Sequence, residues 1–129
     1  MKKVFLIVII FTTLLTACKK YGTRLEFNGG ELYYTKTVTE EEANRLGTFL
    51  VSEGFFEGNP ISVLLDKADS VYIFKMVAKE GAETQEGNVQ IAQSFSQSIS
   101  AHVFGGAPVD FHFCDAYFVT KLKVPYLSE

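Results

Sequence analysis

Several features that would point to particular functions are scarce or missing from this sequence. Its 129 residues include no tryptophan and only two cysteines, Cys18 and Cys114. A disulfide-rich secreted scaffold is therefore excluded, because one bridge at most is possible. Positive charge is also in short supply, with 12 Lys and Arg against 15 Asp and Glu, for a formal net charge of −3. We therefore expect no nucleic acid partner, since nucleic acids bind to basic surfaces.

Motifs that would hold a cofactor or a metal are missing as well. The sequence has no glycine-rich phosphate loop, because Gly29-Gly30 and Gly105-Gly106 fit a tether and a helix end. The histidines are His102 and His112, and their spacing to Cys114 matches no known metal-site pattern. We therefore expect no cofactor and no bound metal.

Long apolar runs are confined to the N-terminus, where residues 4–15 follow Lys2 and Lys3. This run is shorter than the ~20 residues that span a bilayer but has the length of a signal-peptide core, ~7–15 residues. It ends in Leu15-Thr16-Ala17-Cys18, which resembles the lipobox of bacterial lipoproteins. An ordinary signal peptide with a chance cysteine is the alternative interpretation.

The lipoprotein resemblance implies a location and a first partner. A lipobox implies cleavage before Cys18 and a thioether from its thiol to diacylglycerol, so that a membrane lipid anchors the chain outside the cytoplasm. Lys19 occupies the place where Asp retains enteric lipoproteins in the inner membrane. In a two-membrane envelope, the outer membrane is therefore favoured.

Three segments follow from this interpretation. Residues 1–17 are the expected signal peptide, residues 18–30 are the lipidated cysteine with a flexible Gly- and Asn-containing tether, and residues 31–129 form a single domain. Twelve phenylalanines and six tyrosines supply enough apolar bulk for one core.

The domain is expected to alternate strands and helices. Thr39 and Glu42 form a capping-box pattern before a helix that stops at Gly54. A second helix is expected over residues 89–104, with an apolar stripe of Ile91, Phe95, Ile99 and Val103. The expected strands cover residues 31–36, 61–66, 71–79, 108–114 and 118–124.

This order, β-α-β-β-α-β with an added strand, is typical of the ferredoxin-like plan, an α+β sandwich with two helices on one face of an antiparallel sheet. A pattern shared by residues 56–63 and 104–111, Phe-x-Gly-x-Pro followed by a β-branched residue, supports two equivalent halves. Alternation in the strand near residue 110 predicts that Phe111 and Phe113 face the helices and that His112 lies on the opposite, open face.

The open face is the expected binding surface, and its candidate residues are Tyr33, Lys75, His112 and Lys121. We expect a non-catalytic domain that binds a protein or another component of the cell envelope there. The alternative is a thiol-dependent enzyme or redox protein, in which His112 activates Cys114 two residues along the same strand. Burial of Cys114 as an inert residue is the other interpretation of that side chain.

The body of the sequence also resembles a family of small exported bacterial proteins whose function is uncharacterised. The likeness lies in Glu31-Leu32-Tyr33-Tyr34-Thr35-Lys36, in Val103-Phe104-x-Gly-x-Pro-Val and in Cys114-Asp115, and it covers roughly residues 30–124. It implies no catalytic residues.

Overall fold

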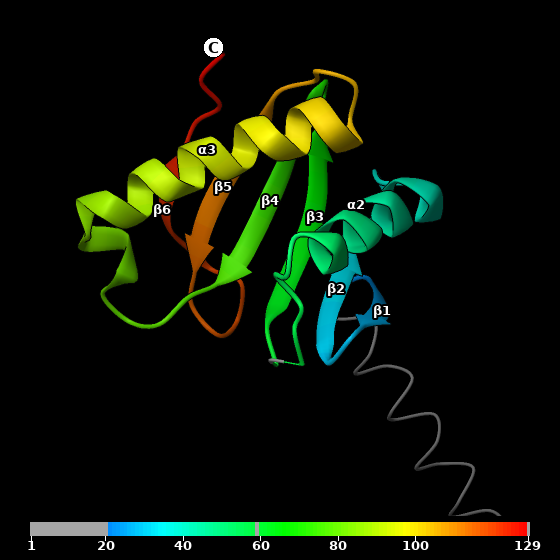
Figure 1. Cartoon of the computed structure of the whole chain (residues 1–129), viewed down its shortest axis with the longest axis horizontal. Helices are drawn as coiled ribbons and strands as arrows, with labels where there is room; N and C mark the ends of the chain where they lie inside the picture. The colour runs from blue at the N-terminus through cyan, green and yellow to red at the C-terminus, as the bar shows by residue number, and fades with distance from the viewer. Residues whose placement is uncertain (1–20, 59, 129) are drawn as a thin grey trace, which may run out of the picture.

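A computed structural model describes residues 21–58 and 60–128 of the chain. In this part, a six-stranded sheet carries two α-helices on one face (Figure 1). Cys18 and the expected signal peptide lie outside the described residues. The strands are β1 (Thr23–Phe27), β2 (Gly30–Tyr34), β3 (Ser62–Ala68), β4 (Val71–Val77), β5 (Val109–Cys114) and β6 (Thr120–Val124).

Helix α2 (Glu40–Ser52) begins and ends where its local sequence predicts. The Glu42 amide donates to the Thr39 hydroxyl and the Thr39 amide donates to the Glu42 carboxylate, so the expected capping box is formed. At the other end, Gly54 adopts a φ of 75°. The Phe55 amide then donates to the Leu50 carbonyl, as in a Schellman motif.

Helix α3 (Glu86–Val103) follows a short 3-10 turn, η1 (Ala82–Thr84), and presents a different face from the one expected. Ile99 and Val103 are buried as predicted, but Ile91 is 66 % exposed. Residues four apart drift by about 40° around a helix with 3.6 residues per turn. Over three such steps the drift carries Ile91 off the buried stripe, which Ala92, Ser96 and Ser100 complete.

The α+β class and the placement of two helices on one face are as expected, but the sheet is mixed rather than antiparallel. Its order is β1-β2-β3-β4-β5-β6, and the pairs β2/β3 and β4/β5 are parallel. In a ferredoxin-like sheet a further strand splits the two parallel strands of each β-α-β unit. Here those strands are direct neighbours, so the ferredoxin-like topology is not confirmed.

The two crossovers have opposite hands. Both helices cover the same face and share one core, with Phe49 of α2 against Phe95 of α3. The strands of the second unit run opposite to those of the first, while the chain crosses the sheet in the same direction. Figure 1 shows that β2-α2-β3 is the left-handed crossover, an arrangement seen in only about 2 % of such connections. The pattern shared by residues 56–63 and 104–111 therefore marks similar helix-to-strand turns, and the two halves do not superimpose.

Part of the expected tether belongs to the sheet. Residues 23–27 form β1, which pairs antiparallel with β2 around a turn at Asn28 and Gly29. Phe27 of this strand stacks on Phe56 with ring centroids 6.2 Å apart. A β-carbon on Gly47 of α2 would lie 2.2 Å from the Phe27 ring. The glycine thus lets α2 approach β1, and the folded unit begins before residue 30.

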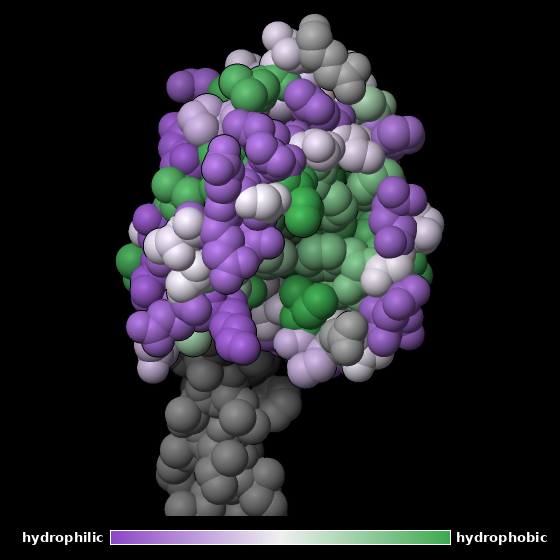
Figure 2. Space-filling view, turned by 60° about the vertical axis from the view of Figure 1, so that its left-hand side comes forward, coloured by the Kyte–Doolittle hydropathy of each residue, from purple (hydrophilic) through white to green (hydrophobic). Residues whose placement is uncertain are grey.

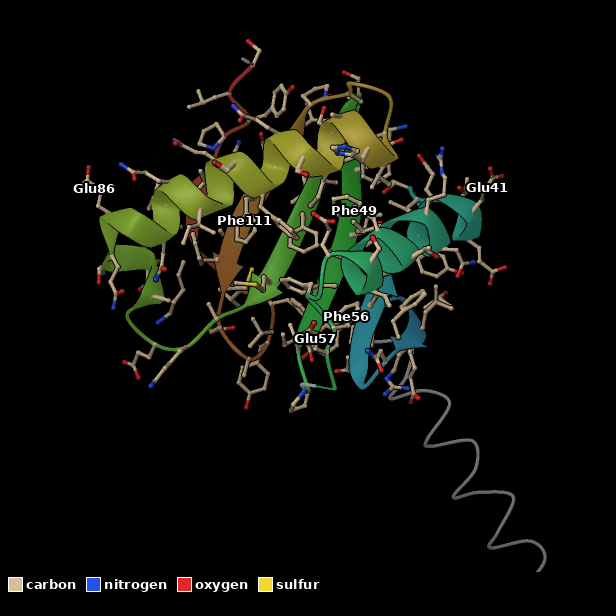
Figure 3. The ribbon with its side chains drawn as sticks, viewed as in Figure 1. Glu41, Phe49, Phe56, Glu57, Glu86 and Phe111 are labelled. Carbon is tan, nitrogen blue, oxygen red and sulfur yellow. The ribbon has the colours of Figure 1, made fainter. Side chains whose placement is uncertain are left out.

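The core lies between the helices and one face of the sheet. Leu32, Leu65, Phe74 and Phe111, from four neighbouring strands, are all buried there. Phe111 and Phe113 face the helices as alternation predicted. Figure 3 shows Phe49, Phe56 and Phe111 between the helices and the sheet, whereas Glu41 and Glu86 point outward from the helix ends.

Candidate functional site

No helix among the described residues covers the opposite face of the sheet, which divides into a polar and an apolar part. The register places Lys75 of β4, His112 of β5 and Lys123 of β6 side by side across three strands. The Asp110 carboxylate forms an ion pair with Lys123, with Oδ2 and Nζ 3.6 Å apart. Three of the four predicted binding residues, Tyr33, Lys75 and His112, share this face, while Lys121 is exposed at the irregular pairing of β6 with β5.

His112 is half-buried, and its ring nitrogens have unlike surroundings. Its Nδ1 lies 2.8 Å from the Thr120 hydroxyl, whereas its Nε2 is buried without a hydrogen-bond partner among the described residues. Burial lowers the pKa of the His112 imidazole, and the positive charge of Lys75 lowers it further. This shift favours the neutral imidazole, so His112 adds little positive charge to this face.

Asp66 of β3 is an anionic group on the same face as Lys75. The Thr35 and Thr37 hydroxyls donate to its Oδ1 at 2.7 and 2.9 Å, and the Lys67 amide donates at 2.8 Å. Burial opposes ionisation of Asp66, but these hydrogen bonds outweigh it and hold its pKa below the ordinary value. Both carboxylates of this face, Asp66 and Asp110, are thus already held by hydrogen bonds or an ion pair.

An apolar cluster, which we call the open-face cluster, occupies the rest of this face. Its buried members are Leu64, Cys114 and Phe118, and Tyr21, Tyr33 and Val77 pack against them. Cys114 is 1 % exposed, and its Sγ lies 3.9 Å from the Thr120 hydroxyl. Burial raises the pKa of the Cys114 thiol. This environment favours an inert thiol, because a reactive cysteine needs an accessible thiolate.

A groove opens on the helix-bearing side of the molecule, at the end of the sheet where β4 and β5 finish. It has a volume of about 530 Å³ and lies between η1, the first half of α3 and the loop after α2. Figure 2 shows a hollowed apolar area framed by hydrophilic side chains. The groove is lined by Phe55, Ile61, Met76, Val77, Ala78, Lys79, Ala82, Asn88, Ile91, Ala92, Phe95, Phe111 and Phe113.

The groove offers apolar contact and little polar chemistry. Met76, Phe95 and Phe113 form part of its wall, and the exposed Ile91 stands at its side. Lys79 is the charged residue among those that line it, and the Asn88 amide is already bonded to the Ala82 carbonyl at 3.1 Å. Pockets of ~300–1,000 Å³ with mostly apolar walls are typical of sites for small ligands.

Comparison with known proteins identifies the family of this domain. The model of the AF_1994_N family, described as a family N-terminal domain, matches residues 24–125. The chain belongs to this family. The match confirms that the body of the sequence belongs to an uncharacterised family, whereas export of the chain stays a prediction. No curated protein and no solved structure matches the chain.

The limits of the AF_1994_N match agree with the limits of the sheet. The match begins at Arg24 inside β1 and ends at Pro125, directly after β6. The expected lipobox, residues 15–18, lies outside the matched range. Within the described residues, no three His, Cys, Asp or Glu side chains are grouped to hold a metal ion. No helix in residues 21–58 or 60–128 is long and apolar enough to cross a membrane.

Sequence reasoning found the open face of this family member but missed the groove. The groove gathers side chains from five separate segments, and their proximity depends on a strand order that local patterns do not encode. One signal was present, because Phe55 and Ile61 are apolar residues in a loop segment that also contains Gly54, Gly58 and Pro60. Apolar side chains in such a loop often cover a core or line a site.

Proposed function

We propose that this AF_1994_N family member is a lipid-anchored binding domain of the bacterial envelope, without catalytic function of its own. Its anchor is the Cys18 thiol, which the lipobox sequence Leu15-Thr16-Ala17-Cys18 marks for lipidation. The residue after the cysteine, Lys19, favours the outer membrane where two membranes exist. The folded part binds an anionic amphiphile with an aliphatic chain, such as a fatty acid, in the groove beside α3.

The observation that carries this proposal is the groove itself, an apolar hollow of about 530 Å³ that is open to solvent. An aliphatic chain that enters it removes apolar surface from water, which contributes roughly 25 cal/mol per Å² buried. Lys79, two residues after the end of β4, supplies the positive charge that a carboxylate head would meet. An uncharged protein loop would make no use of that lysine, and we therefore favour the anionic amphiphile.

The open face is less suited to a ligand of this kind. Tyr33 packs in the open-face cluster, and Asp110 is paired with Lys123. A ligand there would have to displace Tyr21 and Phe118 or compete with hydrogen bonds that are already made. A partner protein that uses Lys75 and Lys121 is the second possibility, and it would bind independently of the groove.

Anchoring is tested by labelling cells with a fatty-acid analogue while they express the full chain. The wild type is expected to take up the label and to appear in the membrane fraction. Cys18→Ala is expected to lose the label and to accumulate as precursor, because the thioether cannot form. Label that persists in Cys18→Ala would refute the lipoprotein assignment.

Binding is tested on the full chain, reconstituted in vesicles from which detergent has been removed. A fluorescent fatty acid is titrated into this sample. Saturable binding is expected, with a tenfold or greater loss in Ile91→Glu, because a carboxylate at the groove wall repels the ligand head and disrupts the apolar lining. Lys79→Gln should weaken binding less. Val51→Glu is the matched control, since Val51 is exposed on α2 outside the groove. Equal affinity in Ile91→Glu and Val51→Glu would exclude the groove as the site.

A further inference from the structure

The N-terminal end of the described chain is fixed against the open face by three aromatic rings. Tyr21 lies edge-to-face against Tyr33 of β2, with centroids 5.5 Å apart, and against Phe118, with centroids 5.3 Å apart. Tyr33 and Phe118 complete the triangle at 5.8 Å. Edge-to-face pairs at these distances are favourable. The point at which the chain enters the domain is therefore held beside the β5–β6 loop.

The β5–β6 loop, residues 115–119, is itself well ordered by hydrogen bonds. The Asp115 carboxylate accepts from the Tyr117 and Val119 amides at 2.8 and 3.1 Å, and the Asp115 amide donates to the Val119 carbonyl at 3.0 Å. Phe118 takes a φ of 60°, which is unusual for a large residue, and turns its ring into the open-face cluster. The loop thereby leaves Tyr117 68 % and Val119 59 % exposed.

Chain length places this loop near the expected anchor. Only Lys19 and Lys20 lie between Cys18 and Tyr21, so the α-carbons of Cys18 and Tyr21 are at most about 11 Å apart. The headgroup layer on each side of a bilayer is only about 5–8 Å thick. A lipid on Cys18 therefore brings Tyr21, and with it the loop that Tyr21 contacts, to the membrane surface.

We infer that the β5–β6 loop is a membrane-contacting element, with Tyr117 and Val119 seated among the lipid headgroups. This inference rests on the proposed lipidation of Cys18. Tyrosine has an apolar ring and a polar hydroxyl, and it is enriched at the membrane interface for that reason.

The contact also holds the groove close to the membrane. The Ala78 amide in the groove wall donates to the Cys114 carbonyl at 3.0 Å, directly before the loop begins. The groove and the loop thus share the end of the sheet where β4 and β5 finish. A membrane-derived amphiphile would then have a short path into the groove.

The test uses the absence of tryptophan from the sequence. Tyr117→Trp places a single fluorophore on the loop of the full lipidated chain, and Asn44→Trp places one on the exposed side of α2 as the control. Both variants are reconstituted in vesicles of phosphatidylethanolamine and phosphatidylglycerol, with and without a lipid that carries a quencher near the headgroup. Flotation first establishes that each variant is bound to the vesicles.

We expect Tyr117→Trp to emit at shorter wavelength in vesicles and to lose most of its emission to the quencher, while Asn44→Trp does neither. Equal and weak quenching of the two variants on floating vesicles would refute the loop contact and leave the anchor intact. Failure of both variants to float would refute the anchor, and the loop contact with it.

Discussion

At the scale of single residues, the accessibility of Cys114 distinguishes the proposed binding domain from the alternative of a thiol-dependent enzyme. Its thiol is 1 % exposed, and burial raises its pKa. In a truncated chain of residues 21–129 it is the single cysteine, so labelling with a chromogenic thiol reagent reports on it alone. We expect slow labelling of the folded chain and fast labelling in urea, because the thiolate forms only after opening. Fast labelling of the folded chain at pH 7 would instead support the thiol enzyme.

His112 gives a second prediction at this scale, on the pH dependence of folding. Its folded-state pKa lies below the ordinary value of about 6.5. As the pH falls below 6.5, the unfolded chain takes up a proton that the folded chain does not, so the free energy of unfolding decreases. Asp66, whose pKa is lowered in the folded chain, adds to this loss only as the pH falls toward the ordinary Asp pKa of about 3.9, where the unfolded chain begins to bind the proton.

Urea titrations between pH 7.5 and 5 measure this effect. The wild-type chain 21–129 should lose stability as the pH is lowered through this range. His112→Gln, which keeps a polar group near Thr120 but has no ionisable ring, should lose less. Parallel pH profiles for the two chains would show that His112 titrates alike in the folded and unfolded states.

At the scale of secondary-structure elements, the sequence predicts correctly those features that depend on residues a few positions apart. The capping box at Thr39 and Glu42 and the glycine at residue 54 located α2 from the sequence, because each acts within a few residues. Period-two alternation likewise assigned Phe111, Phe113 and His112 to their faces. The buried face of α3 was assigned incorrectly at Ile91, because small residues such as Ala92 and Ser96 occupy the stripe that packs on the sheet.

The observed buried face of α3 predicts that the same substitution, Ile to Ala, destabilises the fold at one position of the helix and hardly affects it at another. Ile99 is fully buried, so Ile99→Ala should lower the free energy of unfolding by about 2–5 kcal/mol. Ile91 is 66 % exposed, so Ile91→Ala should change it by about 0.5 kcal/mol or less. Urea denaturation followed by circular dichroism compares the two. A similar decrease in the free energy of unfolding for both variants would mean that Ile91 belongs to the buried stripe of α3 after all.

At the scale of the whole molecule, the strand order lay beyond local patterns. Each β-α-β unit reads the same whether its strands are neighbours or are split by another strand, since the distinction depends on pairing between distant segments. The left-handed β2-α2-β3 crossover runs against the usual preference. The groove depends on both features, because its walls come from η1, α3, the ends of β4 and β5, and the loop after α2.

The membership of β1 in the domain gives the last prediction, because a Gly- and Asn-containing segment was expected to be only a tether. Leu25 and Phe27 of β1 pack against the core, and Phe27 covers Gly47 of α2. Chain 30–129 lacks both side chains and should be less stable than chain 21–129 by about 2–4 kcal/mol, since a fully buried apolar side chain contributes up to ~1.5–3 kcal/mol. Its denaturant m-value should also fall, because less surface is exposed on unfolding.

In chain 21–129, Phe27→Ala should reproduce part of the loss of stability. Glu26→Ala, which removes an exposed side chain from the same strand, should not. Equal urea midpoints for chains 21–129 and 30–129 would mean that β1 is dispensable and that the domain begins near residue 30.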